Sequence, residues 1–82
     1  MNKQQGQRVV ITGAGSGLGR ELALCYAASG ARLALADINE VAARETLRLV
    51  REAGGQGFAQ RCDVRDFSQL AALAQTCAEQ FA

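Results

Sequence analysis

The sequence contains no histidine, no proline and no tryptophan, and it has only one tyrosine and three cysteines among its 82 residues. The cysteines, Cys25, Cys62 and Cys77, are widely spaced and form no Cys-x-x-Cys pair. Because zinc sites are built mainly from such pairs and from histidines, we expect no metal site. Cys25 and Cys77 fall on the apolar faces of expected helices, where a free thiol usually acts as a small hydrophobic side chain; a reactive thiol is the alternative.

An excess of charge of one sign is also lacking. Nine basic and eight acidic residues give a net charge of +1 and are scattered without a basic run, so nucleic acid is not an expected partner. No stretch of about 18 consecutive apolar residues is present, so we expect no span across a membrane. Residues 1–7 form a polar tail without the apolar core of a signal peptide, and we expect a cytoplasmic protein.

The apolar pattern alternates between two periodicities. A short apolar run at residues 8–12 suits a strand buried on both faces, a second strand fits residues 32–36, and a third fits residues 56–61, which contain Phe58. Helical spacing predicts helices over residues 17–29 and 40–53 and a last helix after residue 66. Strands that alternate with helices of this length indicate a parallel sheet with right-handed crossovers. We therefore predict an α/β fold: a Rossmann-type β-α-β-α-β-α unit with strand order 3-2-1, which is one half of a doubly wound fold.

Individual residues predict where the helices begin, end and pack. Gly30 stands where a left-handed C-terminal cap would lie, Asn39 can cap the second helix, and Gly54-Gly55 ends it. Asp66 with Gln69 resembles a capping box for the third helix. The residues expected to share the apolar faces are Leu18, Leu22, Cys25 and Tyr26 in the first helix, Ala43, Leu47 and Val50 in the second, and Leu70, Leu73, Ala74, Cys77 and Phe81 in the third.

The most informative segment is Thr12-Gly13-Ala14-Gly15-Ser16-Gly17-Leu18-Gly19, between the first strand and the first helix. At a helix start, unpaired N–H groups and the helix dipole can bind a pyrophosphate, and glycines permit the tight turn and the close approach of the phosphates. The candidate contacts are Gly13, Ser16, Gly17, Leu18 and Gly19. The alternative is a glycine-rich turn without a ligand.

The spacing T-G-x-x-x-G-x-G differs from the general G-x-G-x-x-G fingerprint and resembles the cofactor loop of the short-chain dehydrogenase/reductase family. The resemblance extends from Arg8 to the end of the chain. It implies a nicotinamide cofactor, an alcohol or carbonyl substrate, and a parent enzyme that forms homo-oligomers.

Asp37 follows the second strand, 18 residues after Gly19. A carboxylate there can accept hydrogen bonds from both hydroxyls of the adenosine ribose, and it would repel a 2′-phosphate. NADP binders of the family usually carry a basic residue beside the second loop glycine or just after the acid, where this chain has Ser16 and Ile38. We therefore predict NAD rather than NADP. A turn or capping role for Asp37 beside Asn39 is the alternative.

Asp63 and Val64 follow the third strand. The resemblance implies that both meet the adenine: the carboxylate accepts from the exocyclic amine, and the next backbone N–H donates to the ring. From the residues alone, Asp63 could equally be a loop acid paired with Arg61 or Arg65.

The catalytic groups of the family are a Ser and a Tyr-x-x-x-Lys pair, which lie downstream of the cofactor half. Here the single tyrosine is Tyr26, followed four residues later by Gly30, and the single lysine is Lys3. We therefore expect residues 1–82 to be the NAD-binding N-terminal segment of an oxidoreductase, inactive without its catalytic half. A non-catalytic NAD-sensing unit and a structural unit without a ligand are the alternatives.

The predicted topology also implies exposed apolar surface. In a doubly wound sheet the first strand pairs with a fourth on its other side, so residues 8–12 alone would present an unpaired apolar edge that invites self-association. On the last helix, Leu73 and Phe81 would face missing neighbours.

Overall fold

A computed structural model describes residues 6–81, so most of the predicted polar tail, including Lys3, lies outside the described residues. The elements are β1 (Arg8–Thr12), α1 (Gly17–Ala28), β2 (Arg32–Asp37), α2 (Glu40–Glu52), β3 (Gln56–Arg61) and α3 (Phe67–Gln80). Their order confirms the predicted β-α-β-α-β-α pattern, and no boundary of the first five elements moves by more than one residue from its predicted position.

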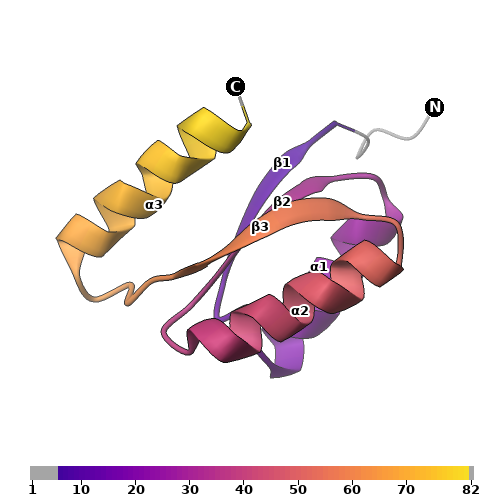
Figure 1. Ribbon diagram of the computed structural model, residues 1–82, viewed down its shortest axis with the longest axis horizontal. Helices are drawn as coiled ribbons and strands as arrows, with labels where there is room; N and C mark the ends of the chain where they lie inside the picture. The colour runs from indigo at the N-terminus through magenta and orange to yellow at the C-terminus, as the bar shows by residue number, and fades with distance from the viewer. Residues whose placement is uncertain (1–5, 82) are drawn as a thin grey trace.

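The three strands form one parallel sheet in the order β1-β2-β3, which is the predicted order 3-2-1 read from the other edge (Figure 1). In the register, Thr12 lies opposite Ala36, and Asp37 lies opposite Arg61. The carboxyl ends of all three strands therefore meet at the same end of the sheet.

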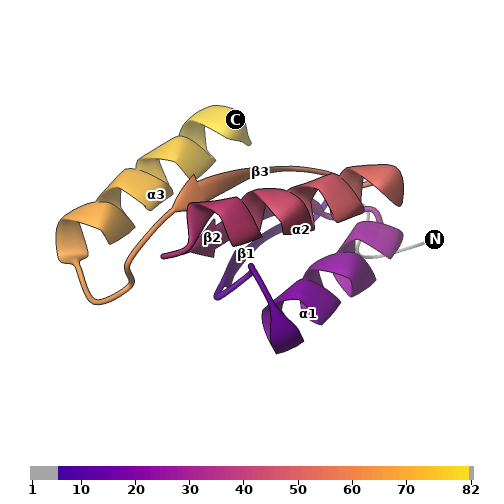
Figure 2. The same ribbon diagram turned by 60° about the horizontal axis from the view of Figure 1, so that its bottom comes forward.

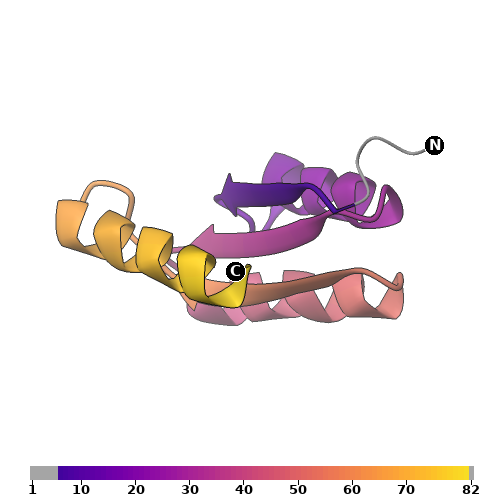
Figure 3. The same ribbon diagram turned by 90° about the horizontal axis from the view of Figure 1, so that it is seen from above.

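The helices cover both faces of the sheet: α1 and α2 lie on one side and α3 lies on the other (Figures 2 and 3). The larger core lies under α1 and α2, and its buried members include Ile11, Leu33, Leu35, Leu47 and Val50. A smaller cluster under α3 joins Ala36, Cys62 and Leu73, with Phe58 and Cys77 packed against it. The sheet is thus a central layer, as the fold class requires.

The helix ends follow the predicted chemistry. Gly30 has φ of 85°, and the N–H groups of Gly30 and Ala31 donate to the carbonyls of Ala27 and Tyr26, which is the Schellman arrangement. The side chain of Asn39 accepts from the amide of Ala42 at the start of α2. These local signals fix where the chain reverses toward the next strand.

The predicted core face of α1 is wrong in part: Tyr26 packs against the core, but the other three predicted residues do not lie in it. Leu18 is 75% exposed and Leu22 is 41% exposed, Cys25 is exposed as well, and the helix buries Ala23 and Ala27 instead. Small alanine side chains let the helix approach the sheet closely, whereas the pattern offered two apolar stripes and could not decide between them. Cys25 is therefore not a core thiol, while Cys77 is half-buried and burial raises the pKa of its thiol.

The expectation for α3 is also wrong in part. Leu73 is 4% exposed and Phe81 is 6% exposed, so neither faces solvent. The ring of Phe81 lies 5.5 Å from that of Phe58, and the guanidinium of Arg32 lies 5.5 Å from its centroid. Leu70 does remain exposed at 36%. The end of α3 packs on the sheet itself, where Phe81 is buried and Phe58 is half-buried.

Candidate functional site

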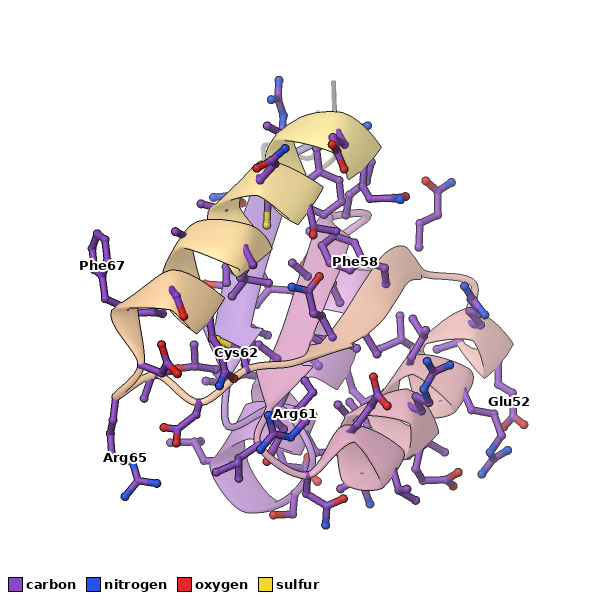
Figure 4. The ribbon with its side chains drawn as sticks, turned by 60° about the vertical axis from the view of Figure 1, so that its left-hand side comes forward. Glu52, Phe58, Arg61, Cys62, Arg65 and Phe67 are labelled. Carbon is purple, nitrogen blue, oxygen red and sulfur yellow. The ribbon has the colours of Figure 1, made fainter. Side chains whose placement is uncertain are left out.

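A groove of about 410 Å³ opens where the three strands end. Its walls are Thr12, Gly13, Asp37, Ile38, Cys62, Asp63, Val64 and Arg65. Four of the predicted site residues, Gly13, Asp37, Asp63 and Val64, therefore lie around one hollow. Figure 4 shows Arg61 and Cys62 at the end of β3 and Arg65 on the segment that leads to α3. Ligands of open α/β sheets bind at this end of the strands.

The glycine loop between β1 and α1 uses its glycines for two physical reasons. Gly13 and Gly17 have φ of 67° and 56°, a left-handed conformation that side chains with a Cβ rarely adopt. Gly19 is required for space, because a Cβ there would lie 2.0 Å from the carbonyl oxygen of Gly13. The loop therefore folds back tightly over the first turn of α1.

Gly15 belongs to this arrangement although it is not among the predicted contacts. A Cβ on Gly15 would lie 2.6 Å from the Cβ of Ala42 and 2.8 Å from Oδ2 of Asp37. The spacing of the motif treats this position as variable, so only the packing of α2 against the loop identifies it.

The start of α1 has no internal anion. Its N-cap residue, Ser16, makes no side-chain capping hydrogen bond, and the first turn holds no acidic residue. The first amides of a helix have no intrahelical acceptor and carry the positive end of the dipole. Ser16, Gly17, Leu18 and Gly19 therefore present backbone donors that can hold an anionic group.

Asp37 lies between the loop and the groove. Its Oδ2 accepts from the amide of Gly15 at 2.8 Å, and its Oδ1 accepts from the amide of Asn39 at 2.9 Å. The alternative interpretation as a turn residue beside Asn39 is thus part of its role. Because an ionised carboxylate offers about four acceptor positions, each oxygen keeps one for a further donor.

The carboxylate of Asp63 is bound by Arg65. The backbone N–H and Nε of Arg65 both donate to Oδ1 at 3.0 Å, and Nη2 donates to Oδ2 at 3.0 Å. Hydrogen bonds from Arg65 lower the pKa of Asp63 to about 2, so this carboxylate stays ionised. The loop-acid interpretation is therefore realised with Arg65. Asp63 and Val64 nevertheless line the groove, and Oδ2, which takes one hydrogen bond from Arg65, retains an acceptor position.

Two further residues at the loop have no signal in the sequence pattern. Thr46 on α2 is 0% exposed and donates to the carbonyl of Ala14, and Arg20 on α1 donates to the carbonyl of Gly15. Thr46 interrupts an apolar face and Arg20 follows the last loop glycine, so neither stands out before the elements are packed.

No acid–base pair accompanies the groove in the part of the chain that the structure describes. Tyr26, the single tyrosine, packs against the core on α1. Within residues 6–81 no group of three or more His, Cys, Asp or Glu side chains is arranged to hold a metal ion, and no helix is long and apolar enough to cross a membrane.

Comparison with known proteins gives a consistent result. The family model described as short chain dehydrogenase matches residues 7–82. The 7α-hydroxysteroid dehydrogenase of Escherichia coli is 44% identical over 69 residues, which are 84% of this chain and 27% of that protein. The chain thus spans about a quarter of the length of this relative.

Solved structures agree with the fold. A 7α-hydroxysteroid dehydrogenase complexed with NADH and 7-oxoglycochenodeoxycholic acid superposes with a TM-score of 0.93 at 38% identity, covering 95% of this chain and 31% of that one. A short-chain dehydrogenase/reductase from Burkholderia phymatum in complex with NAD gives a TM-score of 0.92 at 42% identity and covers 99% of this chain and 29% of that one.

Proposed function

The chain belongs to the short-chain dehydrogenase/reductase family of oxidoreductases, and from this premise we propose that it is the NAD-binding portion of an enzyme that transfers hydride between the nicotinamide and an alcohol or carbonyl substrate. The observation that carries the proposal is the uncapped start of α1 beside the carboxylate of Asp37 at one end of the sheet. Amides there suit a diphosphate, and the carboxylate suits the adjoining ribose.

The residues present fit such a cofactor. A Cβ at Gly15 would clash with Ala42 and Asp37, and a Cβ at Gly19 would clash with the carbonyl of Gly13. The two glycines therefore allow the loop to fold so that its backbone can surround a phosphate. In the proposal, Gly13 and the segment from Ser16 to Gly19 hold the diphosphate, Asp37 holds the ribose, and Asp63 with Val64 meets the adenine. The bound nicotinamide would supply the hydride chemistry, and this chain's residues would bind and orient its adenosine end.

We propose NAD rather than NADP because of the charge of Asp37. A 2′-phosphate beside this carboxylate would bring like charges together in a partly buried site. Neither Ser16 nor Ile38 offers a compensating cation, and the guanidinium of Arg65 is already engaged by Asp63. The pairing of Arg65 with Asp63 therefore also favours NAD over NADP.

The experiment that tests this proposal is a titration of the ¹⁵N-labelled chain with NAD, followed by amide chemical shifts. We expect the amides of residues 13–19 to shift, with a dissociation constant no better than roughly 0.1–1 mM, or about −4 to −5.5 kcal/mol. The amides of Ser68 and Gln69, already bound by Asp66, are the internal control. If residues 13–19 do not respond, the proposed function is wrong.

A second titration separates the two cofactors. Asp37→Ala should weaken NAD binding and reduce the discrimination against NADP, because it removes both the ribose acceptor and the repulsion. Asp37→Asn is the matched control, since its side-chain oxygen can still accept from Gly15. Unchanged selectivity in Asp37→Ala would show that Asp37 does not set the preference.

A non-catalytic NAD-sensing protein would use the same groove. The sequence of residues 1–82 does not separate it from the dehydrogenase, because both would bind the cofactor through the same loop and carboxylate. The coding frame after Ala82 separates the two functions, because a Tyr-x-x-x-Lys pair encoded there supports the dehydrogenase. Three free cysteines are compatible with a reducing compartment, and we propose the cytoplasm.

Self-association of the chain through β1 is also part of the proposal. Among the described residues β1 pairs only with β2, and Val10 on it is 50% exposed. An open apolar edge of this kind is a template for pairing with a second copy. Sedimentation velocity should detect dimers that Val10→Lys removes. A monomeric wild-type chain would contradict this part of the proposal.

A further inference from the structure

Two polar side chains, those of Thr46 and Arg20, donate hydrogen bonds to carbonyl groups of the glycine loop. The hydroxyl of Thr46, on α2, donates to the carbonyl of Ala14 at 2.7 Å. The guanidinium of Arg20, on α1, donates through Nη2 to the carbonyl of Gly15 at 2.6 Å and through Nε to the hydroxyl oxygen of Thr46 at 2.9 Å. Two adjacent loop carbonyls are therefore fixed by two helices that also bond to each other.

Because Thr46 is buried, the loss of its hydrogen bonds would be energetically costly. Thr46 is the only buried polar residue within residues 6–81, and its exposed fraction is 0%. A buried hydroxyl is costly unless its hydrogen bonds are made, and here it donates to Ala14 and accepts from Arg20. Nη2 of Arg20 also lies 3.4 Å from the carbonyl of Ala42, which ties the loop to the first turn of α2.

The direction of the carbonyls decides the direction of the amides. In a trans peptide the carbonyl of one residue and the N–H of the next point to opposite sides, and no cis peptide occurs in the described residues. With the carbonyls of Ala14 and Gly15 drawn toward α2, the N–H groups of Gly15 and Ser16 point away from it. The amide of Gly15 meets Asp37 at 2.8 Å on that side.

We infer that Arg20 and Thr46 are positioning residues that preorganise the glycine loop for the cofactor diphosphate; this inference rests on the proposed function. A glycine-rich segment has more backbone freedom to lose than any other, so an unrestrained loop would have to be ordered by the ligand itself. The pair fixes the loop before binding and thereby removes that cost from the affinity.

The test uses Thr46→Val and Arg20→Met, which remove the donors and keep most of the side-chain volume. Each variant has a matched control: Thr76→Val removes a hydroxyl that bonds the carbonyl of Ala72 on α3, and Arg48→Met removes a guanidinium on α2 that pairs with Glu45 and Glu52. Thr46→Ser restores the hydroxyl. NAD and adenosine are titrated separately by amide shifts, and ¹⁵N relaxation of residues 13–18 is measured without ligand.

We expect Thr46→Val and Arg20→Met to weaken NAD binding about tenfold, the loss that one buried hydrogen bond typically causes. Adenosine binding should stay within about twofold, because adenosine lacks the diphosphate. Order parameters of the loop amides should fall without ligand. The controls should match the wild type, and Thr46→Ser should recover most of the NAD affinity. A merely structural role would weaken NAD and adenosine alike.

The outcomes separate the two claims. If the wild type binds NAD and both variants bind it equally well with an unchanged loop, the inference is wrong and the proposed function stands. Equal losses for NAD and adenosine would overturn it in the same way. If the wild-type loop does not respond to NAD, the proposed function fails and the inference fails with it. Should Thr46→Val not fold, Arg20→Met with its control Arg48→Met carries the same test.

Discussion

The starts of α1 and α3 lie at the same end of the sheet and follow parallel strands, yet they are built in opposite ways. At α3, Asp66 accepts from the amides of Ser68 and Gln69, and Gln69 in turn accepts from the amide of Asp63 at 2.8 Å. At α1, Ser16 provides no side-chain cap and the first turn has no acidic residue. One helix start contains its own anion, and the other contains none.

The difference teaches where a ligand can bind. Hydrogen bonds, first of all from the hydroxyl of Ser68, keep the pKa of Asp66 below its usual value, so a negative charge already occupies the positive end of α3. At α1 the corresponding first-turn amides have no side-chain acceptor, and Arg20 and Thr46 bind the loop through its carbonyl groups. Capping stabilises α3 as structure, whereas the absence of a cap leaves the first amides of α1 available for the external anion that we propose.

The largest expected effect comes from removing the space at α1. In Gly19→Ala the new Cβ would lie 2.0 Å from the carbonyl oxygen of Gly13, so the backbone of the loop must shift to relieve the clash. We expect a loss of about 3 kcal/mol in the free energy of unfolding, measured by urea denaturation.

Gly54→Ala is the matched control for that variant. Gly54 has φ of 87° but open space around it, so only the conformational cost of about 1 kcal/mol should appear. Equal stability of Gly19→Ala and the wild type would show that the loop is not held where the structure places it.

The next effect comes from giving α1 the cap that α3 has. Ser16→Asp should stabilise the helix by about 0.5–1 kcal/mol, because its carboxylate accepts from the first-turn amides. It should also weaken NAD binding about tenfold or more, since it occupies the donors and repels the diphosphate. Ser16→Asn supplies a cap without charge and separates the two causes. Tighter NAD binding by Ser16→Asp would refute the role assigned to these amides.

A smaller effect is expected from removing the cap of α3. Asp66→Ala leaves the amides of Ser68 and Gln69 without their acceptor, and it should lower the melting temperature by about 4 °C. Asp66→Asn keeps an acceptor and should lose less. NAD binding should not change in either variant. A loss of NAD affinity equal to that of a loop variant would mean that the two helix starts are not independent.

The smallest effect is a pH dependence beside α3. Because the folded pKa of Asp63 is lowered to about 2, its contribution to stability is complete above the ordinary value of 3.8 and is lost as the pH falls toward 2. Arg65→Met should move the midpoint of Asp63, followed by its carboxyl ¹³C shift, back toward 3.8. Arg61→Met should move it less, because Arg61 acts only through longer-range charge. A midpoint near 3.8 in the wild type would exclude the Arg65 pairing in solution.

The elements were predictable because their signals are local. Runs of apolar residues, the turn glycine Gly30 and the cap Asn39 act within a few residues of themselves, and the structure follows them. The capping box at Asp66 is only half correct: Asp66 caps α3, but Gln69 accepts from the amide of Asp63 instead of that of Asp66. The direction of a long side chain depends on which neighbours the fold brings to it.

Likewise, some residues of the candidate site could be predicted from the sequence and others could not. The sequence locates the loop from Gly13 to Gly19 and the acids Asp37 and Asp63, because their spacing from the strands is visible. The motif does not identify Gly15, because the residue that requires a glycine there, Ala42, belongs to another helix. The buried face of α1 could not be predicted from periodicity for a related reason. Leu18 and Ala23 lie on two different apolar faces of the helix, and only contact with the sheet decides which face is buried.

The sequence by itself determined the order of strands and helices, the parallel sheet and the glycine loop between β1 and α1, since periodicity and turn chemistry are properties of neighbouring residues. Tertiary structure alone decided which stripe of α1 is buried, that Phe81 packs on Phe58, and that Arg20 and Thr46 grip the loop carbonyls. Apart from the contact between Arg20 and Gly15, which are five residues apart, those contacts join residues far apart in the chain, and their energies exist only once the sheet has brought the helices together.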